Sequence, residues 1–354
     1  NQGITMYSKI KIKYEATIEQ TLKTHAVKTI LFILFSISSV SSWAYENNYQ
    51  VGRGIHDITG PAAEVGLMGY ANPEQKSAGI HTRQWSRAYV VADPNTDNRV
   101  VFVSVDAGAL FQSVFQGVIN KLNQKYGDLY TEQNVVLSAT HTHAAVGGQS
   151  HYGLYDITIL GFIQQAYDAQ VNGIVASIEK AHNDLKPGYI LINRGDLTNA
   201  SYNRSIEAYN NNPLEERTKY GSEIQKPMTV LKILQDGNNE VGMISWFATH
   251  PNAMGKDLKL LSGDNKGHAS YLFEKELKHS TYQGNSNFVA AFAISNAGDM
   301  SPNINSDSEG RGPTTDRFEN VKIIGERQYL KALELYESAT EQLTGSIEFT
   351  QRYV

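Results

Sequence analysis

Residues that could do chemistry follow three apolar segments of the chain, at the points where each segment ends. The segments are Val135–Thr140, Val241–Thr249 and Phe288–Ser295. They end at His141-Thr-His143, at His250-Pro251 and at Asn296-Ala-Gly-Asp-Met-Ser-Pro-Asn303. Strands that end together in a sheet bring their following loops into one crevice. The pattern therefore predicts a shared site built from residues more than a hundred positions apart, as in a metal-dependent hydrolase.

The two histidines of the first motif are suited to binding one metal ion. His141 and His143 are two positions apart, so in an extended chain both side chains point to the same side. Neutral imidazole is a usual zinc ligand, and zinc acidifies water for hydrolysis. A structural role stays open for each of them, and equally for His250 at its own strand end. Gly147-Gly148 removes side-chain bulk nearby, which suits close approach of backbone or substrate.

The third loop has two interpretations. A strand that runs into a glycine-containing turn with Ser301 has the general layout of an exposed nucleophile, although it lacks the G-x-S-x-G motif. In the other interpretation Asp299 and Ser301 bind backbone amides of the turn, and the loop taken alone favours it. Asp106-Ala-Gly108 marks a fourth strand end, where a structural carboxylate is the default expectation.

The N-terminus has the composition of a secretory leader. Lys28 precedes the apolar run Thr29–Val40 and then Ser42-Trp-Ala44, which is typical of a signal peptide with cleavage near Ala44. The run is short for a membrane span, and a retained anchor is the alternative. We therefore expect an N-terminal extension and signal peptide over residues 1–44, a folded domain over 45–354, and a secreted or periplasmic protein.

Composition excludes some classes of protein. The chain has 354 residues, of which 41% are hydrophobic, enough for one large domain or two. It has no cysteine, so a metal would be held by His, carboxylate or Tyr. The five lysines and two glutamates of residues 1–44 sum to +3, so the chain without them carries −8 instead of −5. An acidic chain without a basic cluster is a poor binder of nucleic acid, and we exclude that class of partner.

Hydrophobic periodicity predicts an α/β fold, a mixed β-sheet core with flanking helices. Further strands are expected at Arg87–Ala92, Arg99–Val105, Tyr189–Asn193, Met228–Gln235 and Ser346–Val354. Helices are expected along the apolar stripes Phe111–Leu122 and Ile163–Ile178, the second ending near Asp184, and over Lys266–His279 and Phe318–Leu343. The first helix links two strands as a βαβ unit. Residues 199–226 are expected to form a long irregular insertion, and residues 305–313 a polar loop.

Several short blocks occur together and in one order. They are Asp57-Ile-Thr-Gly-Pro-Ala-Ala-Glu64, Met68-Gly-Tyr70, Gly79-Ile-His81 with Arg87-Ala88, Ser138-Ala-Thr-His-Thr-His143, Asn203-Arg-Ser205 with Ala208-Tyr209 and Asn211-Asn-Pro213, Ser262-Gly-Asp-Asn-Lys-Gly267, and Asn296–Asn303. In these blocks the chain from about Val51 to Val354 resembles the N-terminal part of the catalytic domain of neutral ceramidases. These are secreted zinc amidases that cleave ceramide into sphingosine and fatty acid.

The resemblance implies roles for five residues. His141 and His250 would be ligands of Zn²⁺, and His143 would lie beside the ligands or contact the substrate carbonyl. Arg204 would be a polar contact in the active site and Ser301 the catalytic serine. Zinc and nearby donors would activate the amide carbonyl of a ceramide presented at a membrane or micelle surface. The sequence leaves open whether Ser301 attacks or assists zinc-activated water, and it leaves the oligomeric state unknown.

The chain departs from the family in two places. The family usually continues H-T-H with Ser-Gly-Pro-Gly-Gly, whereas this chain has Ala144-Ala-Val-Gly-Gly148, a change expected to alter the loop that borders the substrate. The family's remaining zinc ligands, a Glu and a Tyr, and its C-terminal β-sandwich domain come later than Val354. We therefore expect a truncated catalytic domain of low activity. The alternatives are a secreted metal-dependent esterase or amidase for another acyl substrate, and a non-catalytic lipid-binding remnant.

Overall fold

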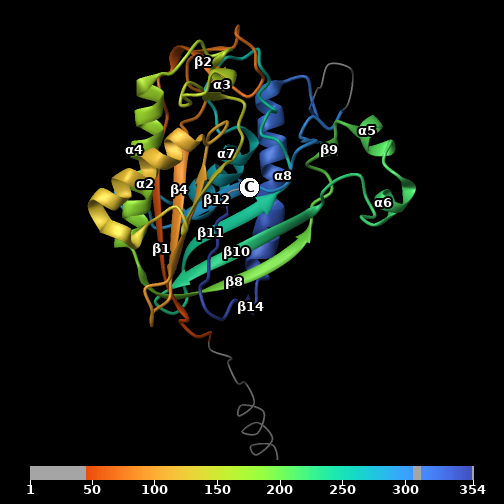
Figure 1. Ribbon diagram of the computed structural model, residues 1–354. Helices are drawn as coiled ribbons and strands as arrows, with labels where there is room; N and C mark the ends of the chain where they lie inside the picture. Colours follow the sequence, from red (N-terminus) through yellow and green to blue (C-terminus); the bar gives the residue numbers. More distant parts are fainter. Residues whose placement is uncertain (1–44, 306–311, 353–354) are drawn as a thin grey trace, which may run out of the picture. The chain divides into compact units, whose positions relative to one another are not determined.

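The core of the chain is a mixed β-sheet with helices packed on its faces (Figure 1). The computed structural model describes residues 45–305 and 312–352, and the expected signal peptide lies outside the described residues. Hydrogen-bonded strands follow the order β12-β11-β10-β8-β1-β4-β5-β6, and β14 pairs with β8. The strands are β1 (Tyr49–Asp57), β4 (Trp85–Ala92), β5 (Arg99–Val105), β6 (Val135–Ala139), β8 (Lys186–Asp196), β10 (Pro227–Gln235), β11 (Asn239–Phe247), β12 (Val289–Ile294) and β14 (Glu341–Gln342).

Four helices cover the sheet, and smaller elements surround its ends. The main helices are α2 (Gln112–Tyr126), α4 (Gln164–Asn183), α7 (Asp264–Tyr271), which continues as a π-helix over Leu272–Leu277, and α8 (Arg317–Glu337). The smaller elements are β2 (Ala63–Met68), β3 (Lys76–Ala78), β7 (Ala145–Val146), β9 (Tyr202–Asn203), β13 (Met300–Ser301), a 3₁₀ turn at Gly127–Leu129, α3 (Gly153–Asp156), α5 (Ile206–Asn210) and α6 (Leu214–Thr218). The predicted α/β class, a mixed sheet with flanking helices, is therefore confirmed.

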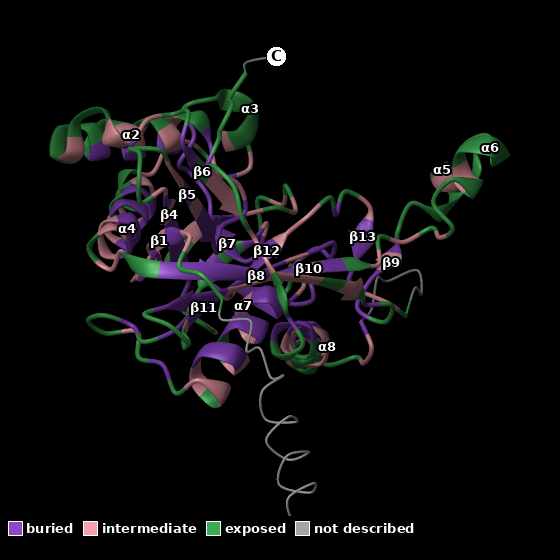
Figure 2. Cartoon of the chain, turned by 90° about the horizontal axis from the view of Figure 1, so that it is seen from below, coloured by how far each residue is buried: buried purple, intermediate pink, exposed green. Residues whose placement is uncertain are grey.

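Both faces of the sheet are buried, as the near-continuous apolar strands require. In β5, Val101, Val103 and Val105 pack under α2 and α4, whereas Val100 and Phe102 point to the other face. In the other half of the sheet, residues of β10, β11 and β12 pack outward against α7 and α8. Figure 2 shows the strands and the inner helix faces buried, and α5 and α6 mostly exposed.

The sheet curls so that its two halves face each other across a shared apolar layer. The hydroxyl of Tyr89, on β4, lies 2.9 Å from the carbonyl oxygens of both Met243 on β11 and Val289 on β12. It also accepts a hydrogen bond from the backbone N–H of Ala291, at 3.1 Å. As a result β12 contacts β4, β5 and β6, although it lies at the opposite end of the strand order. The curl brings the C-terminal ends of β6 and β11 together.

Most predicted elements of the central sheet are confirmed. The hairpin β4–β5 and the parallel βαβ unit β5-α2-β6 form as expected. Helix α4 is capped at Asp184, where its predicted end lies. Among the described residues, no helix combines the length and apolar character needed to cross a bilayer.

Three expectations about the C-terminal part and the insertion need correction. Helix α8 ends at Glu337 and not at Leu343, because Glu341–Gln342 turns back to pair with β8. Residues 346–352 form no strand; Ile347 is buried in the apolar layer without ladder pairing, and residues 353–354 are not described. The insertion 199–226 is not irregular throughout, since it contains β9, α5 and α6. The polar loop 305–313 lies mostly outside the described residues.

Strand β1 was not predicted, because its glycines hide the strand pattern. A Cβ atom at Gly52 would lie 2.0 Å from the carbonyl oxygen of Ala181, and one at Gly54 would lie 2.1 Å from that of Ser177. The glycines therefore let α4 lie directly on β1. This close approach anchors the half of the sheet that carries the His141 loop.

Candidate metal centre

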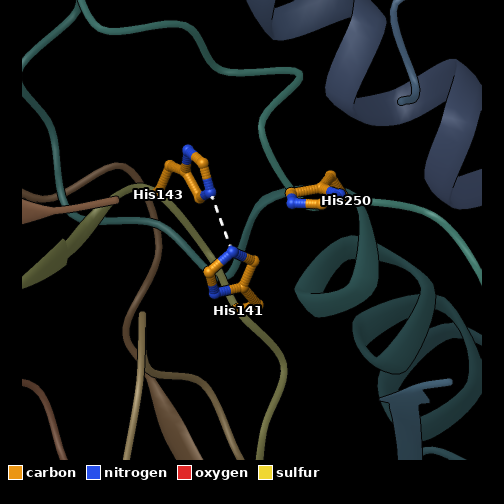
Figure 3. Close-up of side chains that lie close together, drawn as sticks. All are labelled: His141, His143 and His250. Atoms are coloured by element: carbon orange, nitrogen blue, oxygen red, sulfur yellow. Dashed lines mark hydrogen bonds between the residues drawn. The ribbon is translucent and has the colours of Figure 1, made fainter. Parts of the chain in front are cut away.

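Three histidines from two distant loops converge at the ends of β6 and β11 (Figure 3). One ligand nitrogen from each of His141, His143 and His250 lies within 4.8 Å of the others. The ring centroids of His141 and His250 are 4.9 Å apart, and those of His143 and His250 are 5.5 Å apart. The predicted meeting of the two histidine loops is therefore what the structure shows.

Backbone carbonyls orient two of the rings. Nδ1 of His141 donates to the carbonyl oxygen of Gly108 at 2.6 Å. Nδ1 of His250 lies 3.1 Å from the carbonyl oxygens of both Ala297 and Met300. With Nδ1 protonated in each ring, the lone pair is on Nε2, the atom available to a metal. The Asp106-Ala-Gly108 turn and the Asn296–Asn303 loop thus support the site through their backbones.

His143 is buried and neutral. Burial and the nearby His141, His250 and Arg204 lower the pKa of its imidazole to about 3. Its Nε2 lies 3.2 Å from Nε2 of His141, and its buried Nδ1 has no hydrogen-bond partner among the described residues. Imidazole nitrogens brought together in this way are donors that zinc favours. The residues present therefore fit a bound zinc ion.

Gly69 and Tyr70 pack against the ring of His143. Gly69 has a φ of +127°, and a Cβ atom there would lie 2.4 Å from Cγ of His143. The ring of Tyr70 meets that of His143 edge-on, with centroids 4.6 Å apart. The sequence placed both residues in a family block but gave them no role. Their importance is visible only once the fold brings β2 next to the histidine loop.

His141 and His143 converge as predicted, but the reason given for it is wrong, because they do not lie in an extended strand. Strand β6 ends at Ala139, and His141 has a left-handed φ of 69° instead of an extended one. The two rings meet because of this turn, with an interplanar angle of 87°. A non-glycine residue in this region is strained, and such strain is concentrated at functional sites.

Arg204 brings a positive charge to His250. Its Nη2 lies 3.5 Å from Nε2 of His250 and donates to the carbonyl oxygen of Gly298 at 3.0 Å. Burial first, and then the charges of Arg204 and His141, lower the pKa of His250 to about 4. His250 is therefore neutral at pH 7 and able to act as a ligand.

Ser301 lies on β13, directly after a residue that contacts His250. Strand β13 pairs with β9, so that Ser301 is opposite Tyr202. The carbonyl oxygen of Met300 accepts from the backbone N–H of His250 at 2.9 Å. The Ser301 hydroxyl is buried and accepts from the N–H of Asn303 at 3.2 Å, as the turn interpretation expects. The structure thus brings Ser301 to the His250 loop.

Three other residues or segments singled out in the sequence have structural roles. Asp106 is a structural carboxylate, as expected, because it pairs with the buried Arg87 at 3.0 Å. Gly147 and Gly148 face Ile159 and Ile163, so their missing side chains serve packing rather than space for a substrate. Residues 144–146, where the chain departs from the family, are buried in the core beside the site.

Comparison with known proteins points to one family. A family model described as neutral/alkaline non-lysosomal ceramidase, N-terminal, matches residues 49–354. Neutral ceramidase B of Dictyostelium discoideum is 44% identical over 333 residues, covering 87% of this chain and 46% of that protein. The neutral ceramidase of Pseudomonas aeruginosa is 44% identical over 306 residues, covering 86% of this chain and 44% of that protein.

The similarity extends to the fold. The crystal structure of neutral ceramidase from Pseudomonas aeruginosa matches with a TM-score of 0.78 at 44% sequence identity, over 84% of this chain and 46% of that one. The chain thus spans about half the length of the relatives it matches. The sequence blocks, the family model and the fold all point to one assignment. The chain belongs to the neutral/alkaline non-lysosomal ceramidase family.

Proposed function

We propose that this chain carries the metal centre of a zinc-dependent amidase that hydrolyses N-acylsphingosine (ceramide) to sphingosine and a free fatty acid. The observation that carries the proposal is the convergence of three imidazoles, in two of which Nδ1 is bonded to a backbone carbonyl so that Nε2 carries the lone pair. Membership in the ceramidase family names the substrate class. Ceramide would reach the site from a membrane or micelle surface.

His141 and His250 are the residues that would hold zinc, through Nε2. Zinc bound there supplies Lewis acidity toward the amide carbonyl and lowers the pKa of water. The hydrogen bonds from Nδ1 to Gly108, Ala297 and Met300 hold each ring in one orientation. Such outer contacts fix the tautomer and raise the basicity of a ligand.

The other polar residues would act on the substrate. His143, with a pKa of about 3, is a poor base at pH 7 and serves as a neutral hydrogen-bond donor to the amide carbonyl. The guanidinium of Arg204 places a fixed positive charge beside His250, where it can stabilise a developing oxyanion. The hydroxyl of Ser301 attacks the carbonyl or orients the attacking water.

Hydrolysis of a fluorescent ceramide in mixed micelles tests the proposal. We expect slow turnover by this chain, loss of turnover after treatment with a chelator, and recovery when Zn²⁺ is added back. His250→Ala should abolish the zinc-dependent turnover. His279→Asn is the matched control, because His279 is exposed and its φ of 49° is tolerated by asparagine. Ceramide hydrolysis that is indifferent to the chelator would contradict the proposal.

The same assay separates the two alternative functions. An esterase or amidase for another acyl substrate would cleave a short acyl ester and leave ceramide intact. A lipid-binding remnant would bind ceramide in a titration without zinc and cleave neither substrate.

Residues 28–44 support export of the protein, because they have the composition of a signal peptide. N-terminal sequencing of the secreted product would test this.

A further inference from the structure

A buried five-residue segment, Ser262–Lys266, contacts both histidine loops. It lies at the entry to α7, and the side chains of Ser262, Asp264, Asn265 and Lys266 are each at most 1% exposed. The sequence singled out this segment as a family block, but nothing in the proposed chemistry uses it. Three groups of its hydrogen bonds connect the parts of the structure that carry the site.

The first group of contacts holds the H-x-H loop. The hydroxyl of Thr142, between the two histidines, donates to the carbonyl oxygen of Ser262 at 2.8 Å. The backbone N–H of Ser262 donates to the carbonyl oxygen of Ala144 at 2.9 Å. Ser262 is therefore bonded on both sides of His143.

The second group holds the loop of His250. The side-chain amide of Asn265 donates to the carbonyl oxygen of His250 itself at 3.1 Å. The carboxylate of Asp264 accepts from the backbone N–H groups of Ala253 and Met254, at 3.1 and 2.8 Å. This loop is thus fixed at the ligand and again a few residues after it.

The third group joins the ends of two parallel strands. Nζ of Lys266 donates to the carbonyl oxygens of Phe247, at the end of β11, and Ala293, on β12, both at 3.1 Å. Its third partner is Oε1 of Gln328, at 3.2 Å. All three acceptors are neutral oxygens, and an amine buried in this way is costly unless it is hydrogen-bonded. Lys266 thus ties the strand that leads to His250 to the strand that leads to Ser301.

We propose that Ser262–Lys266 is a brace that sets the distance between the His141/His143 loop and His250, with Asn265 and Lys266 as positioning residues. This inference rests on the proposed metal centre for its purpose, but the brace itself is a property of the protein without metal. It explains how loops that follow strands near opposite ends of the sheet keep a common geometry. Without it, the separation of the ligands would depend on the curl of the sheet and on the hydrogen bond from the N–H of His143 to the carbonyl oxygen of Pro251.

Two variants test the brace. Lys266→Met keeps the length of the side chain and removes its donors, and Thr142→Val removes one hydroxyl at nearly constant volume. The matched controls are Lys331→Met, which removes a lysine bonded to the exposed Glu334, and Thr140→Val, which removes a buried hydroxyl that has no partner among the described residues. Thr142→Val also covers the case in which Lys266→Met does not fold.

Hydrogen–deuterium exchange is the first measurement, and it needs no metal. We expect faster exchange at residues 248–254 and 295–301 in Lys266→Met, and at 141–144 in Thr142→Val, with the β4–β5 hairpin unchanged. If exchange rises equally in all segments, Lys266 and Thr142 only stabilise the fold in general. That result would overturn the proposed brace. Unchanged exchange in both variants would overturn it as well.

Competition for Zn²⁺ with a chromophoric chelator is the second measurement. Loss of an outer contact lowers metal affinity by about 10- to 100-fold, and we expect that range for Lys266→Met, with about a fivefold loss for Thr142→Val. Both controls should bind as the unmodified chain does. If the unmodified chain binds no zinc, the proposed metal centre fails, while the exchange pattern still supports or overturns the brace. If the unmodified chain, the two variants and the two controls bind zinc equally well, the brace has no role in setting the ligand geometry.

Discussion

The imidazole rings of His141 and His250 lie with their centroids 4.9 Å apart, although their strands stand near opposite ends of the strand order. The curl of the sheet closes this distance, and the backbone N–H of His143 donates across it to the carbonyl oxygen of Pro251 at 3.1 Å. The candidate metal centre is therefore a product of the long-range fold. Changes that disturb the curl or the loops should act on the site from a distance.

Gly69→Ala should displace His143. The new Cβ atom would lie 2.4 Å from Cγ of His143, and the φ of +127° is unfavourable for alanine. We expect a loss of unfolding free energy of about 2 kcal/mol or more and a loss of ceramide turnover. Urea unfolding and the micelle assay measure the two effects.

Gly161→Ala is the matched control for this variant. Gly161 has a similar φ of +118°, but a Cβ atom there would meet nothing within 4 Å. Gly161→Ala should introduce the same kind of backbone strain without a clash with His143. The variant should therefore keep the zinc affinity of the unmodified chain. Equal losses of turnover in the two variants would show that contact with His143 is unimportant.

Arg87→Met should destabilise the whole domain. Arg87 bonds Asp106 at 3.0 Å and Glu274 at 2.9 Å, and all three side chains are buried. Removing the cation leaves two buried carboxylates without their partner, which costs about 3 to 5 kcal/mol. Thermal and urea unfolding would measure the loss.

The exposed salt bridge between Arg83 and Asp57 provides the comparison for the buried network of Arg87. Arg83 bonds Asp57 at 2.7 Å, but its side chain is 61% exposed, so Arg83→Met should cost less than about 1 kcal/mol. A small effect of Arg87→Met, similar to that of Arg83→Met, would mean that the buried network is not needed for folding.

The stability contributed by Lys266 should rise with pH. Burial lowers the pKa of Lys266 to about 7, whereas an unfolded lysine titrates near 10.5. Between these values the unfolded chain binds more protons at this residue than the folded chain, so stability increases with pH across this window. From pH 7 to 8.5, the unfolding free energy of the unmodified protein relative to Lys266→Met should increase by roughly 1 to 2 kcal/mol. Urea unfolding at both pH values checks this, and a difference that is constant or falls would contradict it.

The sequence was sufficient to predict the elements that carry the site. The apolar runs before His141 and His250 are strands of the predicted extent within one or two residues, because buried strands have a continuous apolar pattern. The βαβ connection of β5, α2 and β6 was equally predictable, since helical periodicity between two such runs has few other solutions.

The geometry within the site could not be predicted in the same way. The left-handed backbone of His141 is selected by the turn that contains it, and no local signal in the residues marks it. The curl depends on contacts such as that of Tyr89 with Met243, between residues far apart in the chain. The bracing role of Lys266 was hidden because a lysine is normally expected at the surface.

The most direct test of the metal centre is anomalous X-ray scattering from crystals of this chain grown with Zn²⁺, measured on both sides of the zinc absorption edge. We predict a zinc peak at about 2.1 Å from Nε2 of His141 and Nε2 of His250. A crystal that binds zinc only elsewhere, or shows no peak between these two rings, would contradict it.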